Sequence, residues 1–252
     1  GFQRDLSDRT ALEIESVCLL SDAVSSALYG VRGGNGVVLV TTKRGNASSL
    51  NVDARYAYGL STPFRKPEFA DAYTYASSVN TAHSGDGLAP RYSQAELAAF
   101  RDGTLPYEYP DVDWWDETMN DVGHTHSLRL SFDGGGNRFR YYAAMDYYRD
   151  RSMLKENVSD PRYSTKPTDT RLSVRANIDV EITGTTLLKA GLAAKLQELN
   201  GTVYGRNNII NVIYSTPSAA FPVRTREGVY GGNSIYGELN PVALLTDKGH
   251  VR

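Results

Sequence analysis

The feature that most constrains the fold is a strict alternation of apolar and polar residues, which returns several times along the chain. It is clearest at 172–182, LSVRANIDVEI, where every second residue is aliphatic and the others are polar or charged. Successive side chains of a β-strand point to opposite faces, so this pattern predicts a strand with one apolar and one polar face. The same alternation occurs at 50–60, 126–133, 138–149 and 187–197. The chain is therefore predicted to be mainly β.

The lengths of these strands and of their connections favour a transmembrane barrel. Most of the predicted strands have roughly 10–13 residues, whereas globular strands average about 5–6 and a tilted membrane-spanning strand needs about 9–11. The connections alternate between long and short, with about 64, 4, 20, 3 and 50 residues. Outer-membrane barrels have short periplasmic turns and longer extracellular loops. We therefore expect short turns at 134–137 and 183–185 and long extracellular loops at about 61–124, 150–169 and 200–248.

Composition is compatible with this interpretation. The mean hydropathy is −0.41 and no apolar run approaches twenty residues, which excludes a transmembrane helix but not barrel strands, because their alternation averages out as hydrophilic. The 17 tyrosines are many for 252 residues, and amphipathic aromatic side chains collect at membrane–water interfaces. A net charge of −2 gives no indication of nucleic-acid binding. The single cysteine, Cys18, excludes an internal disulfide and a cysteine-built metal site, and we expect it to be buried.

Residues 13–45 follow a different plan: a strand, a short helix, a glycine-rich turn and a second strand. Asp22 stands where an N-cap is expected, ahead of a helix predicted at 23–28. Gly30 would end that helix, and three further glycines between 33 and 36 make a tight bend. The β-branched run at 37–42 predicts a buried strand. Taken alone, this is one small α/β unit.

This stretch closely resembles the end of the plug domain of SusC-like TonB-dependent outer-membrane transporters. The residues that match the family pattern are Ile14, Glu15, Ser16, Asp22, Ala23, Ala27, Tyr29, Gly30, Arg32, Asn35, Gly36, Val37, Thr41, Thr42, Lys43 and Gly45. Two departures are mild, since Leu20-Ser21 replaces the usual Leu-Lys and Gly33-Gly34 replaces a common Ala-Ala or Gly-Ala. The segments PDVDWWDE (110–117), TRLSVRANIDVEIT (170–183) and NPVALL (240–245) are also similar to family motifs.

The resemblance implies a plug followed by the start of a 22-stranded transmembrane antiparallel β-barrel. On this basis residues 1–46 are expected to be the C-terminal part of the plug domain. Residues 47–252 are expected to be the N-terminal part of the barrel, with about five to six strands, the last beginning at the terminal HVR. The chain would thus be an internal fragment, with its signal peptide and TonB-contacting segment missing.

The implied function is TonB-dependent import of oligosaccharides, or in some cases peptides, across the outer membrane of Bacteroidota-type bacteria. The implied partners are a SusD-like surface lipoprotein, TonB through the missing segment, the glycan or peptide substrate and outer-membrane lipid. The resemblance implies no cofactor and no enzymatic activity.

The glycine-rich turn is expected to be structural. A phosphate-cradling loop needs a helix directly after its glycines, whereas here the glycines follow the predicted helix and precede a strand. We therefore assign a structural role in the plug to Asp22, Tyr29, Gly30, Arg32, Gly33, Asn35 and Gly36. Eight charged residues on the polar faces of the strands are predicted to line the lumen, where they can hydrogen-bond to the plug: Arg129, Arg138, Arg140, Arg175, Asp179, Glu181, Lys189 and Lys195.

The acidic, tryptophan-containing segment at 110–117 raises the question of carbohydrate chemistry. Its carboxylates could form a glycosidase pair beside a sugar-stacking platform, but such a pair must face each other across about 5–9 Å, which proximity in sequence does not show. Acidic loop residues are usually solvated, so no catalytic residue is predicted. Trp114 and Trp115 are kept as candidate ligand contacts. His124 and His126 have no clear third ligand, and no metal site is predicted.

Two alternatives remain open. A soluble all-β carbohydrate-binding module or glycosidase would show the same alternation but would bury the apolar faces of 126–196 in its own core. A siderophore or cobalamin receptor of the same barrel type would share the fold, and the SusC-like motif argues against it.

Overall fold

The structure, a computed structural model, describes residues 13–22, 29–33, 36–156, 164–236, 239–246 and 250–251. Its strands are β1 (Ile14–Leu20), β2 (Val37–Thr42), β3 (Asn51–Ser61), β4 (Gly123–Gly135), β5 (Phe139–Arg151), β6 (Thr168–Thr183), β7 (Thr186–Gly201) and β8 (His250–Val251). Its helices are α2 (Ala72–Gly85), α3 (Gln94–Asp102), α4 (Trp114–Thr118), α5 (Arg206–Ser215) and α6 (Pro241–Leu244), with 3₁₀ turns η3 (Gly30–Gly33) and η4 (Ser234–Tyr236).

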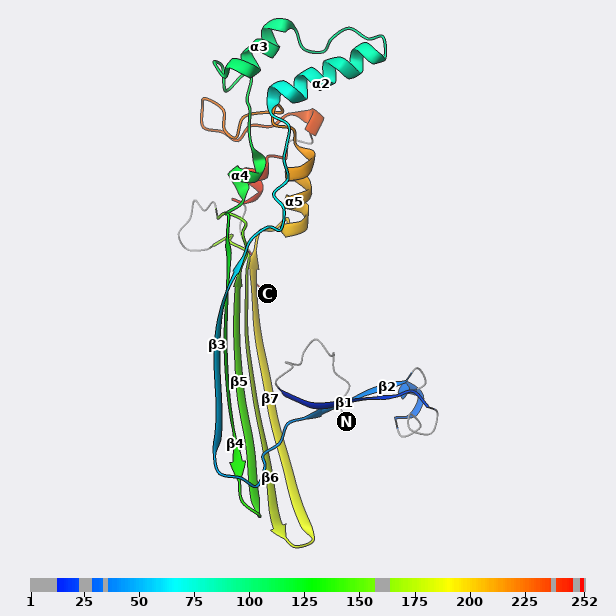
Figure 1. The fold of residues 1–252 in the computed structure, drawn as a ribbon, viewed down its shortest axis with the longest axis vertical. Helices are drawn as coiled ribbons and strands as arrows, with labels where there is room; N and C mark the ends of the chain where they lie inside the picture. Colours follow the sequence, from blue (N-terminus) through cyan, green and yellow to red (C-terminus); the bar gives the residue numbers. More distant parts are fainter. Residues whose placement is uncertain are drawn as a thin grey trace. The chain divides into compact units, whose positions relative to one another are not determined.

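The strands form two sheets, a two-stranded ribbon of β1 and β2 and a larger sheet in the order β3-β4-β5-β6-β7-β8 (Figure 1). The order of the larger sheet follows the chain, as consecutive antiparallel hairpins produce. The prediction of a mainly β, antiparallel fold is confirmed. The predicted sixth strand is also present, since His250 and Val251 pair with Gly201 and Asn200 of β7.

The two short turns lie where the sequence predicts them. Between β4 and β5 the Gly136 amide donates to the Phe139 carbonyl at 2.7 Å. Only two residues separate β6 from β7. Both of these strands have 16 residues, more than the alternating pattern alone indicates. Strands of this length exceed what a tilted membrane span requires.

The chain divides into two compact units, which we describe separately. The first contains Gly1–Tyr58, His126–Arg149 and Thr170–Gln197, and therefore the ribbon together with most of the alternating strand residues. The second contains Gly59–Thr125, Asp150–Asp169 and Glu198–Arg252, and therefore the long connections.

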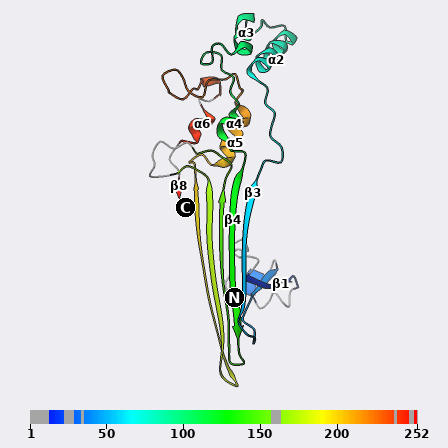
Figure 2. The ribbon, with the colours of Figure 1, turned by 60° about the vertical axis from the view of Figure 1, so that its left-hand side comes forward.

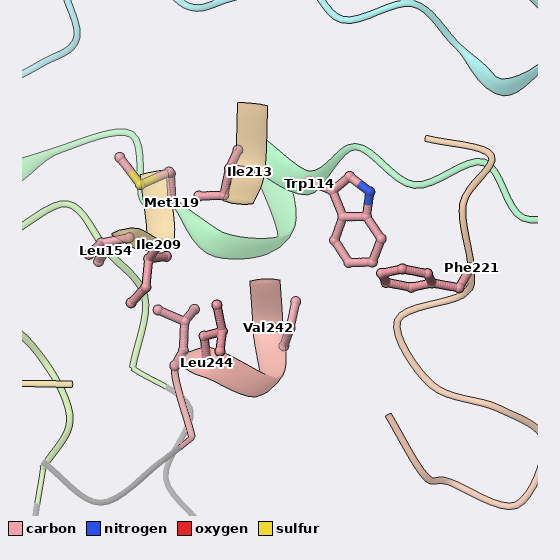
Figure 3. Packing of buried hydrophobic residues seen from close by; sticks show 9 residues of the cluster. Trp114, Met119, Leu154, Ile209, Ile213, Phe221, Val242 and Leu244 are labelled. Carbon is pink, nitrogen blue, oxygen red and sulfur yellow. The ribbon is translucent and has the colours of Figure 1, made fainter. Parts of the chain in front are cut away.

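The second unit has its own hydrophobic core, built by helices from segments far apart in sequence. In Figure 2 the helices α4, α5 and α6 lie close together, and α6 contacts both of the others. The core between them consists of Trp114, Met119, Leu154, Ile209, Ile213, Phe221, Val242, Leu244 and Leu245 (Figure 3). A second, smaller cluster of Ala72, Ala76, Leu97 and Phe100 joins α2 to α3.

Capping explains where the two predicted helices begin. The sequence predicts a helix at 69–82, but α2 begins at Ala72, because the Asp71 side chain caps it by accepting from the Thr74 amide at 2.6 Å. The predicted capping box of α3 is confirmed: Ser93 accepts from the Glu96 amide, and Glu96 accepts from the Ser93 amide. Gly103 closes α3 in the left-handed conformation, with φ of 62°.

Three expectations about local structure are wrong. The connection at 200–248, expected to be irregular, contains α5 and α6, because Ile209 and Ile213 lie one turn apart and pack into the core. Cys18 is exposed rather than buried. The strand at 37–42 is largely exposed as well, because β1 and β2 form a two-stranded ribbon and no further strand of the described residues joins it. The helix predicted at 23–28 lies outside the described residues.

No helix within the described ranges is both long and apolar enough to cross a membrane.

Candidate functional site

The polar face of β6 is buried, whereas its apolar face is exposed. Ser173, Arg175, Asn177 and Asp179 are each at most 8% exposed. On the opposite face, Val174 and Ile178 are 39% exposed and Ile182 is 60% exposed. A water-soluble sheet normally shows the reverse, with aliphatic side chains inside and charged side chains in solvent. The polar face of β6 is thus the one that makes protein contacts.

The base of the β1–β2 ribbon covers this polar face through three consecutive contacts. Arg175 Nε donates to Glu13 Oε2 at 2.8 Å, and both side chains are almost fully buried. Asn177 Nδ2 donates to the Lys43 carbonyl at 2.6 Å. The Arg44 guanidinium pairs with the Asp179 carboxylate. These three pairs, which we call the ribbon anchor, follow β6 at every second residue.

The ribbon anchor joins the two ends of the ribbon to one strand. The Lys43 amide donates to the Glu13 carbonyl at 2.8 Å, so the start of β1 and the end of β2 reach β6 side by side. In the two ion pairs of the anchor, Arg175 with Glu13 and Arg44 with Asp179, each charged side chain lies beside an opposite charge. This pairing is what makes the burial of arginine and carboxylate side chains tolerable, because an unpaired buried charge is very costly.

Two glycines make room for close contacts at the sheet, Gly45 for the backbone after β2 and Gly191 for the Asn177 side chain. A Cβ on Gly45 would lie 2.2 Å from the Tyr141 carbonyl oxygen of β5, a distance that no side chain tolerates. A Cβ on Gly191 of β7 would lie 2.9 Å from Asn177 Oδ1. The chain stays on the sheet after Gly45, since the Gly135 amide donates to the Ser48 carbonyl at 2.9 Å. The segment after β2 is therefore docked onto β4 and β5.

The motif residues that the sequence singles out lie at the other end of the ribbon. Gly30 and Gly36 have φ of 64° and 89°, and the Gly36 amide donates to the Gly33 carbonyl at 2.9 Å, so the predicted tight turn is present. Asp22 and Tyr29 lie beside this turn, where β1 ends at Leu20 and pairs with the start of β2. The side chain of Arg32 and the whole of Asn35 lie outside the described residues. None of the motif residues that the structure describes belongs to the ribbon anchor.

The eight residues predicted to line the lumen include two members of the anchor, Arg175 and Asp179, so their predicted contact with the N-terminal segment is observed. Arg129 instead pairs across strands with Asp146 of β5, with Nε 3.1 Å from Oδ2. The Arg138 carbonyl accepts from the Glu181 amide at 2.8 Å, which joins β5 to β6.

The apolar face of the sheet carries aliphatic and aromatic side chains in solvent. Its exposed aliphatic residues include Val52, Leu60, Leu188, Leu192 and Leu196. Its exposed aromatic residues include Tyr56 and Tyr58 towards one end of the strands and Phe132 and Phe139 towards the other. Large contiguous apolar surfaces on a protein mark membrane or protein contacts.

The structure places Trp114 in the core of the second unit. It is 2% exposed, its Nε1 donates to the Pro217 carbonyl at 3.1 Å, and its ring lies 5.3 Å from that of Phe221 (Figure 3). Trp115 is partly buried against the same core.

Three carboxylates around the tryptophans, those of Asp111, Asp113 and Asp116, are engaged in local structure. Asp111 Oδ1 accepts from the Ala72 amide at 2.8 Å. Asp113 caps α4 by accepting from the Trp115 and Asp116 amides. Asp116 accepts from Lys66 Nζ at 2.5 Å, and this hydrogen bond raises the pKa of Lys66. Their positions therefore follow from capping and pairing rather than from a shared catalytic centre.

Within the part of the chain that the structure describes, the two histidines belong to no metal-binding cluster. His126 Nδ1 lies 2.9 Å from the Tyr56 hydroxyl. Among the described residues, no group of three or more His, Cys, Asp or Glu side chains could hold a metal ion.

Sequence reasoning missed Glu13, Arg44 and Asn177 as members of the contact. Lys43 and Gly45 belong to the matched family pattern, but that pattern gives them no role. The available signal was the run of arginine, asparagine and aspartate on every second residue of an otherwise aliphatic strand. Such a run indicates a polar partner, although it does not identify the partner.

Comparison with known proteins gives several relatives that are similar to this chain in sequence. The TonB-dependent receptor P3 of Formosa agariphila is 27% identical over 93% of this chain and 21% of its own length. The TonB-dependent receptor P26 of the same organism is 27% identical over 97% of the chain and 23% of its own length. The TonB-dependent receptor SusC of Bacteroides thetaiotaomicron is 27% identical over 62% of the chain and 14% of its own length. The chain thus spans about a fifth of the length of the first two relatives. No protein-family profile matches it.

Solved structures show the same fold. A chain of the RagAB peptide importer in its closed-closed state superposes with a TM-score of 0.59 at 18% identity, over 86% of this chain and 26% of that one. A second structure, of the RagAB peptide transporter, gives a TM-score of 0.54 at 21% identity, over 75% of this chain and 22% of the other.

These relatives bear out several predictions. The resemblance to SusC-like TonB-dependent receptors is confirmed over most of the chain. Because the relatives are receptors and not enzymes, the prediction that the chain is not an enzyme is confirmed as well. The predicted location in the bacterial outer membrane agrees with theirs.

Proposed function

We propose that this chain is a segment of a SusC-like TonB-dependent receptor. The parent protein would import oligosaccharides or peptides actively across the bacterial outer membrane. In this proposal residues 1–46 are the end of the plug and residues 47–252 the first part of the barrel wall. The connections at about 61–124, 150–169 and 200–248 are extracellular loops.

The observation that carries the proposal is the inverted burial of β6. Its charged face lies against the ribbon and its aliphatic face is exposed. A barrel wall that separates lipid from a plugged lumen requires this arrangement. A soluble carbohydrate-binding module would instead bury the aliphatic face. The exposed Val174 and Ile178 therefore argue against that alternative.

Two substrate classes are proposed. The resemblance to SusC-like transporters suggests oligosaccharides, and the description of one structural neighbour as a peptide importer suggests peptides. We further propose a SusD-like lipoprotein as the extracellular partner and TonB as the source of energy. A siderophore or cobalamin receptor would share the barrel, and no contact of the described residues favours that alternative.

The proposal is tested by fractionating cells that make the full-length receptor and by treating intact cells with protease. We expect recovery in the outer membrane, with cuts mapped by mass spectrometry to 61–124, 150–169 and 200–248 and none at 134–137 or 183–185. Recovery as a soluble protein, or cuts at the two short turns, would contradict it. Uptake of labelled oligosaccharides and peptides by cells with and without the receptor then separates the two substrate classes.

A further inference from the structure

A group of aromatic and basic side chains lies on the apolar face of the first unit, where β3, β4 and β5 meet the long connections. Tyr56 and Tyr58 lie near the end of β3, and His126 near the start of β4. The Tyr56 hydroxyl is 2.9 Å from His126 Nδ1, and the Tyr58 ring centroid is 5.0 Å from that of His126. Both tyrosines are exposed.

Strand register brings Arg149 beside this group. Arg129 contacts Asp146 across the antiparallel pair of β4 and β5. His126 lies three residues before Arg129 on β4, and Arg149 lies three residues after Asp146 on β5. His126 and Arg149 are therefore opposite each other. The position of Gly123, whose Cβ would meet the Arg151 carbonyl and the chain at Met153, gives the same register. We call Tyr56, Tyr58, His126 and Arg149 the aromatic–basic cluster.

The cluster contains a guanidinium donor that has no acceptor among the described residues. Arg149 Nε is buried from solvent, and no described residue accepts a hydrogen bond from it. Tyr56 engages only Nδ1 of His126, which leaves the Nε2 edge of the ring. A guanidinium presents its donors in a fork that matches a phosphate.

The cluster lies just beyond the apolar band of the sheet. On β6 the aliphatic face runs from Ile182 to Leu172, about 33 Å along the strand at about 3.3 Å per residue. At a tilt of about 40° this run crosses about 25 Å, the height of the apolar band of outer-membrane barrels. The next outward position is Thr170. Thr170 lies opposite Arg149. The Glu181 amide donates to the Arg138 carbonyl, so these two residues are opposite each other. Arg149 lies eleven residues after Arg138, and Thr170 lies eleven residues before Glu181, so they are opposite each other as well.

We propose that the aromatic–basic cluster binds the phosphate of an anionic lipid head group in the leaflet on the loop side of the membrane. The inference rests on the proposed function, since it requires the sheet to span a membrane. Tyrosine at the edge of an apolar band is suited to the head-group level, and a basic side chain there attracts anionic lipid. The guanidinium contributes charge and donors, and the imidazole and phenol groups contribute polar edges above the aliphatic face.

The test uses the full-length receptor purified in a non-ionic detergent. Binding of monophosphoryl lipid A is measured by native mass spectrometry for the parent and for the His126→Gln/Arg149→Gln variant. One basic residue near an anionic head group is worth about fivefold in affinity, so we expect the variant to bind at least about fivefold more weakly. The dephosphorylated lipid should bind the parent as weakly as the phosphorylated lipid binds the variant.

Arg138→Gln is the matched control, because this exposed arginine lies at the opposite end of the β5 hairpin. It should leave lipid binding unchanged. Equal binding by the parent and the double variant, or an equal loss in the control, would overturn the inference. Complete displacement of the lipid by inorganic phosphate would assign the site to free phosphate instead.

Outer-membrane recovery of the same variants separates the two proposals. Membrane recovery with no effect on lipid binding would overturn the lipid site alone. A receptor that is recovered outside the membrane would overturn both.

Discussion

At the scale of single residues, Gly45 sets how closely the segment after β2 lies on the sheet. A Cβ here would meet the backbone of Tyr141, which cannot move without disturbing β5. We expect Gly45→Ala to weaken this docking by about 1–3 kcal/mol, as overpacking does elsewhere. The readout is hydrogen exchange at the Gly135 amide, which donates to Ser48. Gly184→Ala is the control, since nothing lies within 4 Å of that site, and equal exchange in both variants would refute the prediction.

The buried pair of Glu13 and Arg175 makes a second prediction at this scale. Glu13→Leu leaves Arg175 buried without its counter-charge, which typically costs about 3–5 kcal/mol. The Glu13→Leu/Arg175→Met double variant removes both charges and should cost less than the single one. The Lys43 amide donates to the Glu13 carbonyl, so hydrogen exchange at this amide measures the loss of stability. Should the double variant lose as much as the sum of the two single variants, the pair would not be coupled.

At the scale of elements, the capping box of α3 predicts a dependence on pH. The backbone hydrogen bond from Ser93 lowers the pKa of Glu96 below its ordinary 4.5. A depressed pKa means that the stabilisation is present above the unfolded value and is lost as the pH falls through the folded one. Hydrogen exchange in α3, corrected for its intrinsic pH dependence, should therefore rise below about pH 4.5. Glu96→Gln should remove this dependence, and Ser93→Ala should cost about 1 kcal/mol at neutral pH.

The core between α4, α5 and α6 gives a prediction about the two tryptophans. Trp114 fills this core, so Trp114→Ala should destabilise it by about 3–5 kcal/mol. Trp115→Ala should cost clearly less, because that side chain is only partly buried. Limited proteolysis of the receptor at 61–124 and 200–248 is the measurement. If Trp114→Ala reduces uptake without increasing cleavage, Trp114 contacts ligand and its packing role is secondary.

The elements also show what could be predicted from sequence. The strands were predictable because alternation depends only on neighbouring residues. Helix α5 was not predictable from local sequence, because its apolar face is buried by distant residues of the same core, which include Trp114 and Val242. The ribbon anchor was beyond reach for the same reason, since its ion pairs join residues 135 and 162 positions apart. The exposure of Cys18 was missed because a strand pattern does not show how many strands will surround it.

At the scale of the whole molecule, membrane insertion can be tested on the exposed aliphatic face. Ile178 lies near the middle of the apolar run on β6, and Ile182 lies at its end. Arginine on the lipid face costs about 2–4 kcal/mol at the midplane and about 0–1 near the interface. We therefore expect Ile178→Arg to reduce folded receptor in the outer membrane strongly, and Ile182→Arg to reduce it little. In a soluble protein each of these substitutions, at an exposed position, would change the free energy of unfolding by no more than about 0.5 kcal/mol.

The ribbon anchor also has a mechanical consequence. Its three contacts engage β6 in sequence, Glu13 at Arg175, Lys43 at Asn177 and Arg44 at Asp179. A pull on the chain ahead of Glu13 loads the first contact before the other two. The ribbon would then separate from β6 one contact at a time, at a lower peak force than if all three contacts broke together. In the plug that we propose, tension from one end would thus release these contacts in order rather than together.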